Sequence, residues 1–438
     1  MKNYDQSIEY IYGLTKFGVK LGLKNVSCLL SLFDNPHLKT KVIHIAGTNG
    51  KGSTAAMLLS ILKHAGFRVG LYTSPHLIHF QERMRINDDL ITKHDVCSLL
   101  DRIIPKINIV AKTEGYQHPT FFEVITTMAY LYFFENNVDF AIMEAGLGGR
   151  LDATNVCKSI ISVITHIDYD HTDRLGNTLS EIANEKGEII KHNSLTINAR
   201  QYPEAQKMIE HIARKRRTKL YSVGIEINSD IISSNIDGNT FHYSGICNKY
   251  QSLHIPLAGR YQIENASMAI GATELLNKMS FKISKQAIYT GLHESRWPGR
   301  FEIIQREPMI ILDGAHNPNG VTRFVEDLKK YFPNKKIIAV LGAFSDKDYS
   351  NILKIIVPHT DHIILTMANN PRATPTDVLA RETLKYISRE KIVETVSVDS
   401  AIHKALNMAK KNDIVCVTGS LYTVGEAKAY FLEKIKSK

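Results

Sequence analysis

The 438-residue chain, with 44% hydrophobic and 22% charged residues, is too long for one core and is expected to form two or three domains. Its formal charge of +10 is spread along the chain with one dense basic run, residues 214–219, which we expect to be a solvated helix end, so the charge favours a polyanionic small substrate over nucleic acid. The N-terminus has no apolar core, which argues against export, and no apolar run reaches about 18 residues, which argues against membrane insertion. The five cysteines show no C-x-x-C spacing, which argues against zinc and disulfides. We therefore predict a cytoplasmic protein.

The first predicted strand, residues 41–46, runs into a glycine-rich loop and then into a predicted helix, residues 55–66. Glycines let the backbone amides curl around an oxyanion, and the helix directs its positive end to the same place. The strict pattern G-x-x-x-x-G-K-[ST] does not fit, because an extra glycine follows the lysine. An ordinary strand-to-helix turn is the alternative. The order of strand, lysine, hydroxyls and helix nevertheless predicts a nucleotide phosphate site at Gly47, Thr48, Asn49, Gly50, Lys51, Gly52, Ser53 and Thr54.

Strands and helical segments alternate through most of the chain, which is typical of parallel α/β sheets. Residues 225–258 interrupt the alternation with short polar strands, which we expect to form an antiparallel edge hairpin. Apolar strands of the first sheet are predicted at residues 67–72, 138–145 and 160–167. A second series is predicted at residues 309–316, 335–342, 361–368, 391–398 and 413–419. The fold class is therefore α/β, with a doubly wound N-terminal domain that carries the phosphate loop (P-loop), residues 1–296, and a smaller C-terminal α/β domain, residues 297–438.

Hard oxygen ligands for magnesium are expected where the strands of the first sheet end. Glu144 closes one predicted strand and precedes a glycine-rich turn. A helix cap or a surface charge is the alternative role for such a carboxylate. The hydroxyl of Thr73 or Ser74 lies at another strand end, and spacing does not choose between the two. The next strand ends in polar residues of which at least one is expected to face the site: His166, Asp168, Asp170 and His171.

Lys186 lies on the apolar stripe of the predicted helix 178–190, four residues after Ile182 and three before Ile189. We therefore expect it to be half-buried. Its ammonium group either reaches solvent and pairs with Glu185 or Glu188, or is desolvated so that a neutral amine becomes available for chemistry.

Eight motifs occur in order along essentially the whole chain: GTNGKGST, YTSPHL, TFFE, EAGLGGRLDATN, HIDYDHTDRLGNTLSEIANEKG, GRYQIENA, RWPGRFE and ILDGAHNPNG. Together they resemble the folylpolyglutamate synthase and dihydrofolate synthase family, within the Mur ligase superfamily. The resemblance implies an N-terminal ATPase domain, a C-terminal α/β domain that closes over the nucleotide, and ATP-driven amide formation.

The resemblance also implies roles for individual residues. It gives magnesium two sites, with Ser74 and Glu144 as ligands and His171 at the second. It identifies Lys186 with the family's carbamylated lysine, whose carbamate would be a further magnesium ligand, and implies a monovalent cation as a further cofactor. The catalytic set is then Lys51, Glu144, His171 and Lys186. Further ATP contacts are Asn265, Arg300 and Asp313, and His316 beside them is expected to help place the adenine or the glutamate.

The Arg150–Ala153 stretch resembles family members that also use dihydropteroate, in which Phe122, Asp152 and Ala153 would contact the pterin. This favours an enzyme with both activities, although Asp152 could instead cap its own turn in an enzyme restricted to polyglutamylation. One departure from the family pattern is that Gly187 and Glu188 follow Lys186, where family members often carry Ala-Gly.

The implied reaction begins when a substrate carboxylate attacks the ATP γ-phosphoryl group, and glutamate then displaces phosphate from the acyl phosphate. We expect a monomer whose partners are ATP, glutamate and dihydropteroate or a reduced folate. A peptidoglycan Mur ligase should carry a further N-terminal domain before the phosphate loop. A small-molecule kinase would not explain the second α/β domain, and a non-catalytic nucleotide-binding module predicts a gap in the magnesium ligands that the sequence does not have.

Overall fold

The computed structural model describes residues 3–18 and 20–436, which form two compact units. The first unit contains the chain up to Asp230, Phe241–His254 and Glu264–Ser295, and the second contains Ile231–Thr240, Ile255–Ile263 and the chain from Arg296 onwards. Two short segments that precede residue 296 therefore cluster with the second unit. The division into domains 1–296 and 297–438 stays a prediction.

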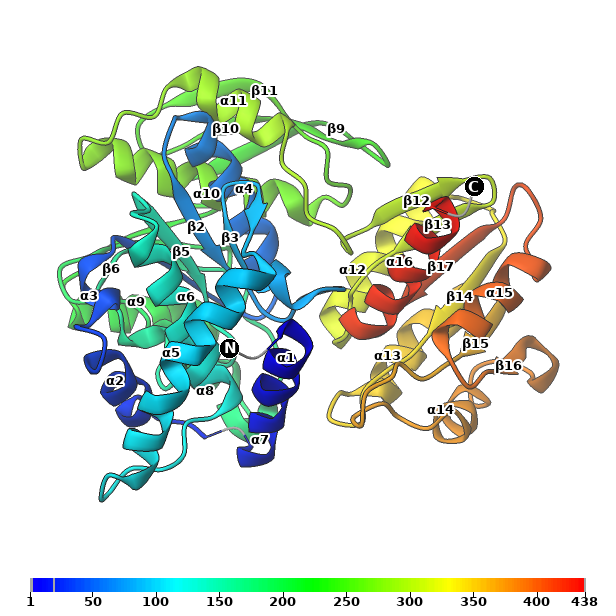
Figure 1. Ribbon diagram of the computed structural model, residues 1–438. Coiled ribbons are helices and arrows are strands. Elements are labelled where there is room, and N and C mark those ends of the chain that lie inside the picture. Colours follow the sequence, from blue (N-terminus) through cyan, green and yellow to red (C-terminus); the bar gives the residue numbers. More distant parts are fainter. Residues whose placement is uncertain (1–2, 19, 437–438) are drawn as a thin grey trace. The chain divides into compact units, whose positions relative to one another are not determined.

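The first unit is built on an eight-stranded sheet in the order β4-β3-β2-β5-β1-β6-β7-β8. Figure 1 labels four of its strands, β2, β3, β5 and β6. Six strands run parallel, while β3 and β4 extend the sheet in antiparallel fashion. The predicted doubly wound fold is confirmed, and the antiparallel extension was not predicted. The strands are β1 Val42–Ala46, β2 Val69–Tyr72, β3 Met84–Ile86, β4 Asp89–Leu90, β5 Phe140–Glu144, β6 Ser159–Ile164, β7 Leu195–Asn198 and β8 Lys219–Ser222.

The centre of this sheet determines where the site lies. β1 pairs with β5 on one side, with Ile45 opposite Glu144, and with β6 on the other, with Ala46 opposite Ile164. The loops that leave these three strands at their carboxyl ends are consequently neighbours. Ligands of open parallel α/β sheets bind at this edge, where the chain changes direction along the sheet.

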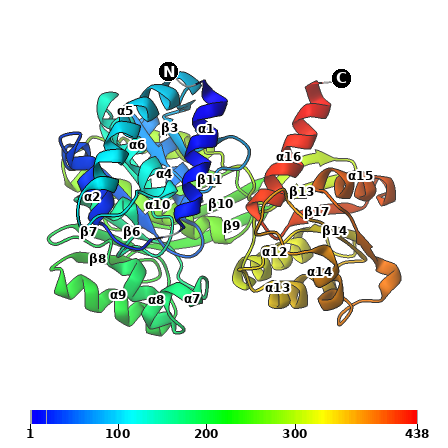
Figure 2. The ribbon, with the colours of Figure 1, turned by 60° about the horizontal axis from the view of Figure 1, so that its bottom comes forward.

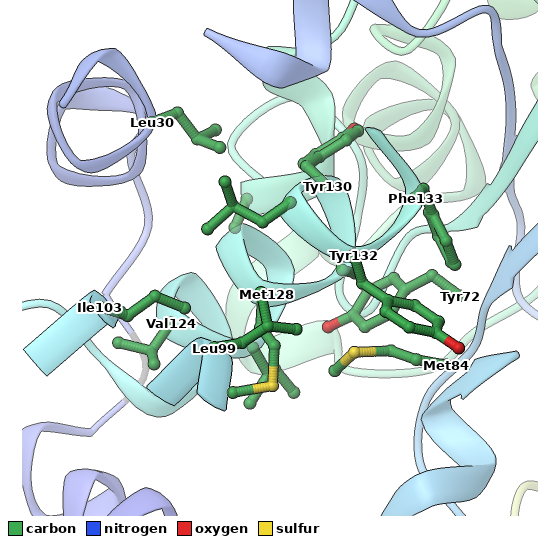
Figure 3. Close-up of a cluster of buried hydrophobic side chains, with 14 of the residues drawn as sticks. Leu30, Tyr72, Met84, Leu99, Ile103, Val124, Met128, Tyr130, Tyr132 and Phe133 are labelled. Atoms are coloured by element: carbon green, nitrogen blue, oxygen red, sulfur yellow. The ribbon is translucent and has the colours of Figure 1, made fainter. Parts of the chain in front are cut away.

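Helices cover the sheet of the first unit. The helix α6 is buried along most of its length, and its apolar side chains pack with those of α5 and with β2 and β3 (Figure 3). It begins with a capping box between Thr120 and Glu123. The helices are α1 Tyr4–Gly13, α2 Lys24–Ser31, α3 Pro36–Lys39, α4 Lys51–His64, α5 Lys93–Lys112, α6 Phe121–Glu135, α7 Thr172–Leu175, α8 Leu179–Gly187, α9 Pro203–Lys215, α10 Tyr261–Lys278 and α11 Lys285–His293, with 3-10 turns η1 Leu14–Phe17, η2 Phe80–Arg83 and η3 Ala153–Val156. The basic run, residues 214–219, begins in the last turn of α9 and is mostly exposed, as predicted.

The polar strands after residue 225 form a three-stranded sheet of their own in the order β11-β10-β9. The two predicted strands correspond to β10, Gly238–Ser244, and β11, Lys249–Ile255, and β9, Asn228–Asn235, adds a third. The predicted hairpin is thus part of a larger separate sheet. The buried carboxylate of Glu274 holds its turn, because it accepts hydrogen bonds from the Tyr243 hydroxyl at 2.9 Å and from the Ile246 and Asn248 amides at 2.8 and 2.9 Å.

The second unit contains a six-stranded sheet in the order β12-β13-β17-β14-β15-β16, parallel except for β12. Helices α12–α14 pack on one face, while α15 and α16 lie on the other (Figure 2). This confirms the predicted second α/β sheet. Its elements are β12 Glu302–Arg306, β13 Met309–Leu312, α12 Pro318–Tyr331, β14 Ile337–Leu341, α13 Tyr349–Ile356, η4 Val357–His359, β15 His362–Leu365, α14 Thr376–Thr383, η5 Arg389–Lys391, β16 Ile392–Glu394, α15 Val398–Met408, β17 Ile414–Thr418 and α16 Leu421–Lys436. Among the described residues, no helix is long and apolar enough to cross a bilayer.

A buried carboxylate on α12 makes the stability of the second unit depend on pH. Asp327 is 5% exposed, and its Oδ2 atom has no hydrogen-bond partner among the described residues. Burial raises the pKa of Asp327 to about 7, against an ordinary 3.8, although Lys330 acts in the opposite direction. Between these two pH values Asp327 is ionised in the unfolded chain but still protonated in the folded protein. The free energy of unfolding therefore falls as the pH rises from about 4 to about 7.

The variant Asp327→Asn should remove this pH-dependent cost. Relative to wild type, the free energy of unfolding should rise by about 2–3 kcal/mol more at pH 8 than at pH 5, since each unit of pKa shift corresponds to about 1.4 kcal/mol. Urea unfolding of both proteins at the two pH values measures the difference. Asp377→Asn, at an exposed position, is the matched control and should show no such pH dependence. An equal effect of Asp327→Asn at both pH values would contradict the assignment.

Candidate active site

The loop after β1 has a shape that only glycine permits at two positions. Gly47 has φ +150° and Gly50 has φ +91°. A Cβ atom on Gly47 would lie 1.9 Å from the Thr165 hydroxyl oxygen, and one on Gly50 would lie 2.3 Å from Asn265 Oδ1. The fold therefore places the predicted contact Asn265, which comes from α10, directly against the predicted phosphate loop.

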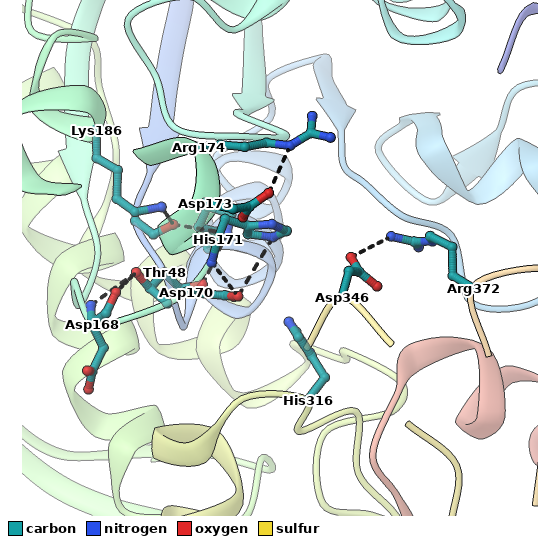
Figure 4. Close-up of polar contacts among 12 residues, drawn as sticks. Thr48, Asp168, Asp170, His171, Asp173, Arg174, Lys186, His316, Asp346 and Arg372 are labelled. Atoms are coloured by element: carbon teal, nitrogen blue, oxygen red, sulfur yellow. Dashed lines mark hydrogen bonds and ion pairs between the residues drawn. The ribbon is translucent and has the colours of Figure 1, made fainter. Parts of the chain in front are cut away.

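Two lysine side chains converge on one carbonyl oxygen in this loop. Lys51 donates hydrogen bonds to the carbonyl oxygens of Gly47 and Thr48, both at 3.1 Å. Lys186 donates to the same Gly47 oxygen at 3.0 Å (Figure 4). Lys51 is itself the first residue of α4, at the end where the helix dipole is positive. The arrangement concentrates positive charge at one point and favours a bound anion.

The loop amides divide into two groups. The amides of Thr48 and Asn49 donate to the carbonyl oxygen of His166 at 2.9 and 3.2 Å, so they hold the loop against the end of β6. The Thr48 hydroxyl also bridges the backbone of Asp168, with both distances 3.0 Å (Figure 4). The amides of the first turn of α4 have no partner within the helix, as at every helix start, and are the groups that can bind a phosphate.

The carboxyl end of β5 brings together two predicted magnesium ligands. Glu144 is 5% exposed, and its Oε2 atom accepts a hydrogen bond from the Ser74 amide at 3.3 Å. Thr73 is buried, whereas Ser74 is partly exposed. The structure therefore favours the Ser74 hydroxyl over that of Thr73.

The segment after β6 contains the other candidates. Asp168 is tied to Thr48, and His166 lies 3.6 Å from its carboxylate. His171 has a left-handed backbone, φ +53°, at the start of α7, and its Nε2 atom lies 3.8 Å from Asp170 Oδ1 (Figure 4). In the described part of the chain, no three His, Cys, Asp or Glu side chains are grouped so as to hold a metal ion. A magnesium ion here needs further oxygen ligands, such as phosphate oxygens and water.

Lys186 is more deeply buried than predicted. It is 4% exposed, so its ammonium group does not reach solvent. The two carboxylates considered as its partners contact other cations, Glu185 with Arg150 and Glu188 with Arg216. The adjoining Gly187 allows α8 to pack on α9, because a Cβ there would lie 2.6 Å from Ile212 Cδ1.

The predicted pterin contacts surround the turn that follows Glu144. The Phe122 ring packs on Gly146, where a Cβ would lie 2.5 Å from its Cζ atom. Asp152 is 4% exposed and Ala153 is 5% exposed. Asp152 caps η3 and accepts four hydrogen bonds from the chain itself, from the Gly146, Leu147 and Thr154 amides and the Thr154 hydroxyl. The turn-capping role considered for Asp152 is therefore confirmed.

The motif residues of the second unit form a cluster at the end of β13. The buried Asp313 accepts hydrogen bonds from the Phe301 and Ala315 amides, both at 2.8 Å. Burial raises the pKa of Asp313, while the Arg300 charge lowers it. His316 donates from Nδ1 to the Gly314 carbonyl oxygen at 2.8 Å. These contacts fix the orientations of Asp313 and His316.

Sequence reasoning missed two residues of the first unit that support the site, Thr165 and His44. Thr165 closes the space behind Gly47, and His44, fully buried within β1, contacts the residues that support the turn after Glu144. A histidine in an otherwise aliphatic strand was the available signal for His44. Thr165 had none, because its role depends on the pairing of β1 with β6.

Comparison with known proteins identifies the family. Residues 45–273 match the Mur ligase middle domain, and residues 299–421 match the Mur ligase glutamate ligase domain. The dihydrofolate synthase/folylpolyglutamate synthase of Bacillus subtilis (strain 168) is 36% identical over 430 residues, which cover 97% of this chain and 98% of that protein. The chain belongs to the folylpolyglutamate synthase and dihydrofolate synthase family. It is thus a member of the ATP-dependent Mur-type ligases, as the sequence motifs predicted.

Solved structures of this family share the fold. The folylpolyglutamate synthase of Thermotoga maritima matches with a TM-score of 0.85 and 36% identity, covering 98% of this chain and 97% of that one. Escherichia coli FolC in complex with DHPP and ADP matches with a TM-score of 0.88 and 29% identity, covering 100% and 99%. Both matches span the two units described above.

Gly47→Ala should abolish nucleotide binding, because the added methyl group must displace Thr165 and with it the carbonyl oxygen that both lysines share. Calorimetric titration with magnesium and ADP measures the effect. The matched control is Gly66→Ala, which also has a positive φ, +88°, but open space around the new Cβ. It should lose about 1–2 kcal/mol of stability and retain ADP affinity. Wild-type affinity in a folded Gly47→Ala protein would contradict this role of the loop.

Proposed function

We propose that this protein joins glutamate to folates at the expense of ATP, and that it also joins glutamate to dihydropteroate. It would thus combine folylpolyglutamate synthase and dihydrofolate synthase activities. The names of its relatives support both halves of the proposal, and ADP in the Escherichia coli relative supports ATP as the phosphoryl donor.

The observation that carries the proposal is the convergence of Lys51 and Lys186 on the Gly47 carbonyl oxygen, beside the first turn of α4. A triphosphate placed there would compensate the charge of Lys51 and accept hydrogen bonds from backbone amides at the helix start. This favours a phosphate-transferring enzyme over a protein that binds a neutral ligand.

The proposed chemistry transfers the γ-phosphoryl group of ATP to a carboxylate of the acceptor, which gives an acyl phosphate and ADP. The amine of glutamate then attacks the acyl carbon, and inorganic phosphate leaves as the amide forms. No side chain acts as a nucleophile. The contribution of Lys51 is to neutralise charge on the transferred phosphoryl oxygens and to hold the nucleotide in place.

Ser74, Glu144 and His171 are the residues that would hold magnesium at two sites. The fit rests on donor chemistry, because a hydroxyl, a carboxylate and an imidazole supply few ligands and leave positions for phosphate oxygens and water. When bound, magnesium neutralises phosphate charge during phosphoryl transfer. The chain itself aligns Ser74 and Glu144 through the hydrogen bond between them.

The burial of Lys186 and its place beside Lys51 support carbamylation. A carbamate would replace one of two neighbouring positive charges with an anionic oxygen ligand. A nuclear magnetic resonance signal from carbon-13 bicarbonate that disappears in Lys186→Gln would support this proposal, and a signal that persists in the variant would contradict it. A monovalent cation as a further cofactor also stays a prediction.

Phe122 is the strongest of the proposed pterin contacts, because its ring is partly exposed and packs on the backbone of a glycine turn. Asp152 and Ala153 are buried, so their proposed contribution is to shape the turn that a flat ring would approach. Arg300, Asp313 and His316 remain proposed contacts for ATP or glutamate, alongside Asn265. The monomeric state and the cytoplasmic location also stay predictions.

The test is glutamate-dependent ADP formation with dihydropteroate as the sole acceptor and, separately, with a reduced folate. Wild type should use both, and Glu144→Gln, which removes the charge but keeps the shape, should use neither. Phe122→Ala should raise the KM for dihydropteroate about tenfold, equivalent to about 1.4 kcal/mol of lost contact, and leave the KM for ATP unchanged. Phe134→Ala, on the same helix with its ring 39% exposed, is the matched control.

Each outcome of this test has a distinct meaning. Turnover of the reduced folate alone would identify a monofunctional folylpolyglutamate synthase. If wild type shows no glutamate-dependent ADP formation with either acceptor, the proposal is overturned and a peptidoglycan-type Mur ligase is favoured.

A further inference from the structure

A continuous series of buried polar groups lies behind the turn that follows Glu144. It links β1, η3 and the turn through His44, Thr154 and Asp152. His44 and Thr154 are fully buried, and Asp152 is 4% exposed. Polar groups this deep are costly unless each one is paired, so their arrangement requires an explanation.

The hydrogen bonds of this series can run in only one direction. Asp152 Oδ2 accepts from the Gly146 and Leu147 amides at 2.9 and 2.8 Å, and Oδ1 accepts from the Thr154 amide at 3.0 Å and the Thr154 hydroxyl at 2.5 Å. An ionised carboxylate can only accept. The Thr154 hydroxyl hydrogen is therefore directed at Asp152, and its oxygen is left to accept a hydrogen bond.

That remaining hydrogen bond comes from His44. The Nε2 atom of His44 lies 2.8 Å from the Thr154 hydroxyl oxygen and must carry the ring hydrogen. The other ring nitrogen, Nδ1, is then free to accept from the Cys157 thiol at 3.8 Å. Burial lowers the pKa of His44 to about 3, with a smaller effect from the Lys191 charge. The ring therefore stays neutral in this single tautomer at physiological pH.

The turn that Asp152 holds touches two parts of the proposed site, Phe122 and the end of α8. Gly146 packs on Phe122, and a Cβ on Gly149 would lie 2.8 Å from the carbonyl oxygens of Glu185 and Lys186. The Arg150 amide donates to the Glu185 carbonyl oxygen at 2.7 Å. A displacement of the turn would therefore alter the acceptor side of the site through Phe122 and the end of α8 that carries Lys186.

We propose that His44 is a positioning residue of the acceptor site: by donating to Thr154 it directs the Thr154 hydroxyl at Asp152, which in turn holds the Gly146–Leu147 amides. The effect on substrate rests on the proposed function, whereas the effect on the turn does not. His44 itself contacts no reacting group, and all of its influence passes through Thr154 and Asp152. Tyr130 supports the series from the side, because its hydroxyl donates to the Thr154 carbonyl oxygen at 2.7 Å.

Two pairs of variants test this. His44→Leu removes the donor, whereas His44→Gln keeps an N–H near the position of Nε2; Thr154→Val removes the hydroxyl, whereas Thr154→Ser keeps it. Hydrogen–deuterium exchange of a peptide covering residues 145–151 reports on the turn in the full-length protein. Exchange should be about tenfold faster in His44→Leu and Thr154→Val, since a lost buried hydrogen bond is worth about one factor of ten. The two conservative variants should restore most of the protection.

Kinetics give the second measurement. The disruptive variants should raise the KM for the pterin acceptor about tenfold, with ADP affinity unchanged, and the conservative variants should restore it. Wild-type exchange in folded His44→Leu would overturn the proposal. Equal loosening of the peptide 41–46 in β1, or a Gln variant that behaves like the Leu variant, would do the same, because either result indicates lost packing rather than a lost hydrogen bond. If His44→Leu does not fold, the Thr154 pair decides. If wild type turns over no pterin acceptor, the proposed function fails, but the exchange measurement still tests the role of His44.

Discussion

The carbonyl oxygen of Gly47, which accepts hydrogen bonds from both Lys51 and Lys186, is the contact on which the candidate site depends. This oxygen can face both lysines only because Gly47 adopts a backbone conformation that other residues resist. Gly47 also packs directly against Thr165, which follows the neighbouring strand β6. That contact in turn requires the pairing of β1 with β6 at the centre of the sheet. Burial of Lys186 on α8 then brings a second lysine side chain to the same carbonyl oxygen. Sheet register, helix packing and phosphate binding are thus parts of one arrangement.

The side of the site that would bind the folate or dihydropteroate acceptor depends on a buried carboxylate, that of Asp152. Asp152 satisfies four donors within the chain, and burial raises its pKa while those hydrogen bonds act to lower it. A carboxylate so fully occupied is a rigid support for the glycine turn rather than an open ligand. The partly exposed Phe122 is then the residue of this region that can meet a flat substrate. The two sides of the site meet at α8, whose C-terminal end touches the turn and carries Lys186.

Much of this could be predicted from the sequence because the signals were local. Apolar runs gave the buried strands, the glycine pattern gave the phosphate loop, and the helical spacing of Lys186 indicated partial burial. Features that depend on tertiary pairing were not predictable in this way. The contact of Thr165 with Gly47 and the role of His44 join segments distant in the chain. The strands β3, β4 and β9 pair locally, but β3 and β4 are only three and two residues long, and β9 is polar and mostly exposed, so none of them has a buried apolar run. The sequence predicted only the turn-capping part of the four hydrogen bonds of Asp152. The other donors, the Gly146 and Leu147 amides, reach Asp152 because the turn after Glu144 folds back on itself, which the sequence does not indicate.

The central claim is that ATP activates the acceptor by phosphorylating its carboxylate. The most direct measurement is the fate of oxygen-18 placed in that carboxylate of a folate acceptor, followed by mass spectrometry of the inorganic phosphate released during glutamate-dependent turnover. An acyl phosphate requires one oxygen of the carboxylate to leave with phosphate, so the label should appear there in proportion to amide formed. Phosphate that remains unlabelled while amide accumulates would contradict the account.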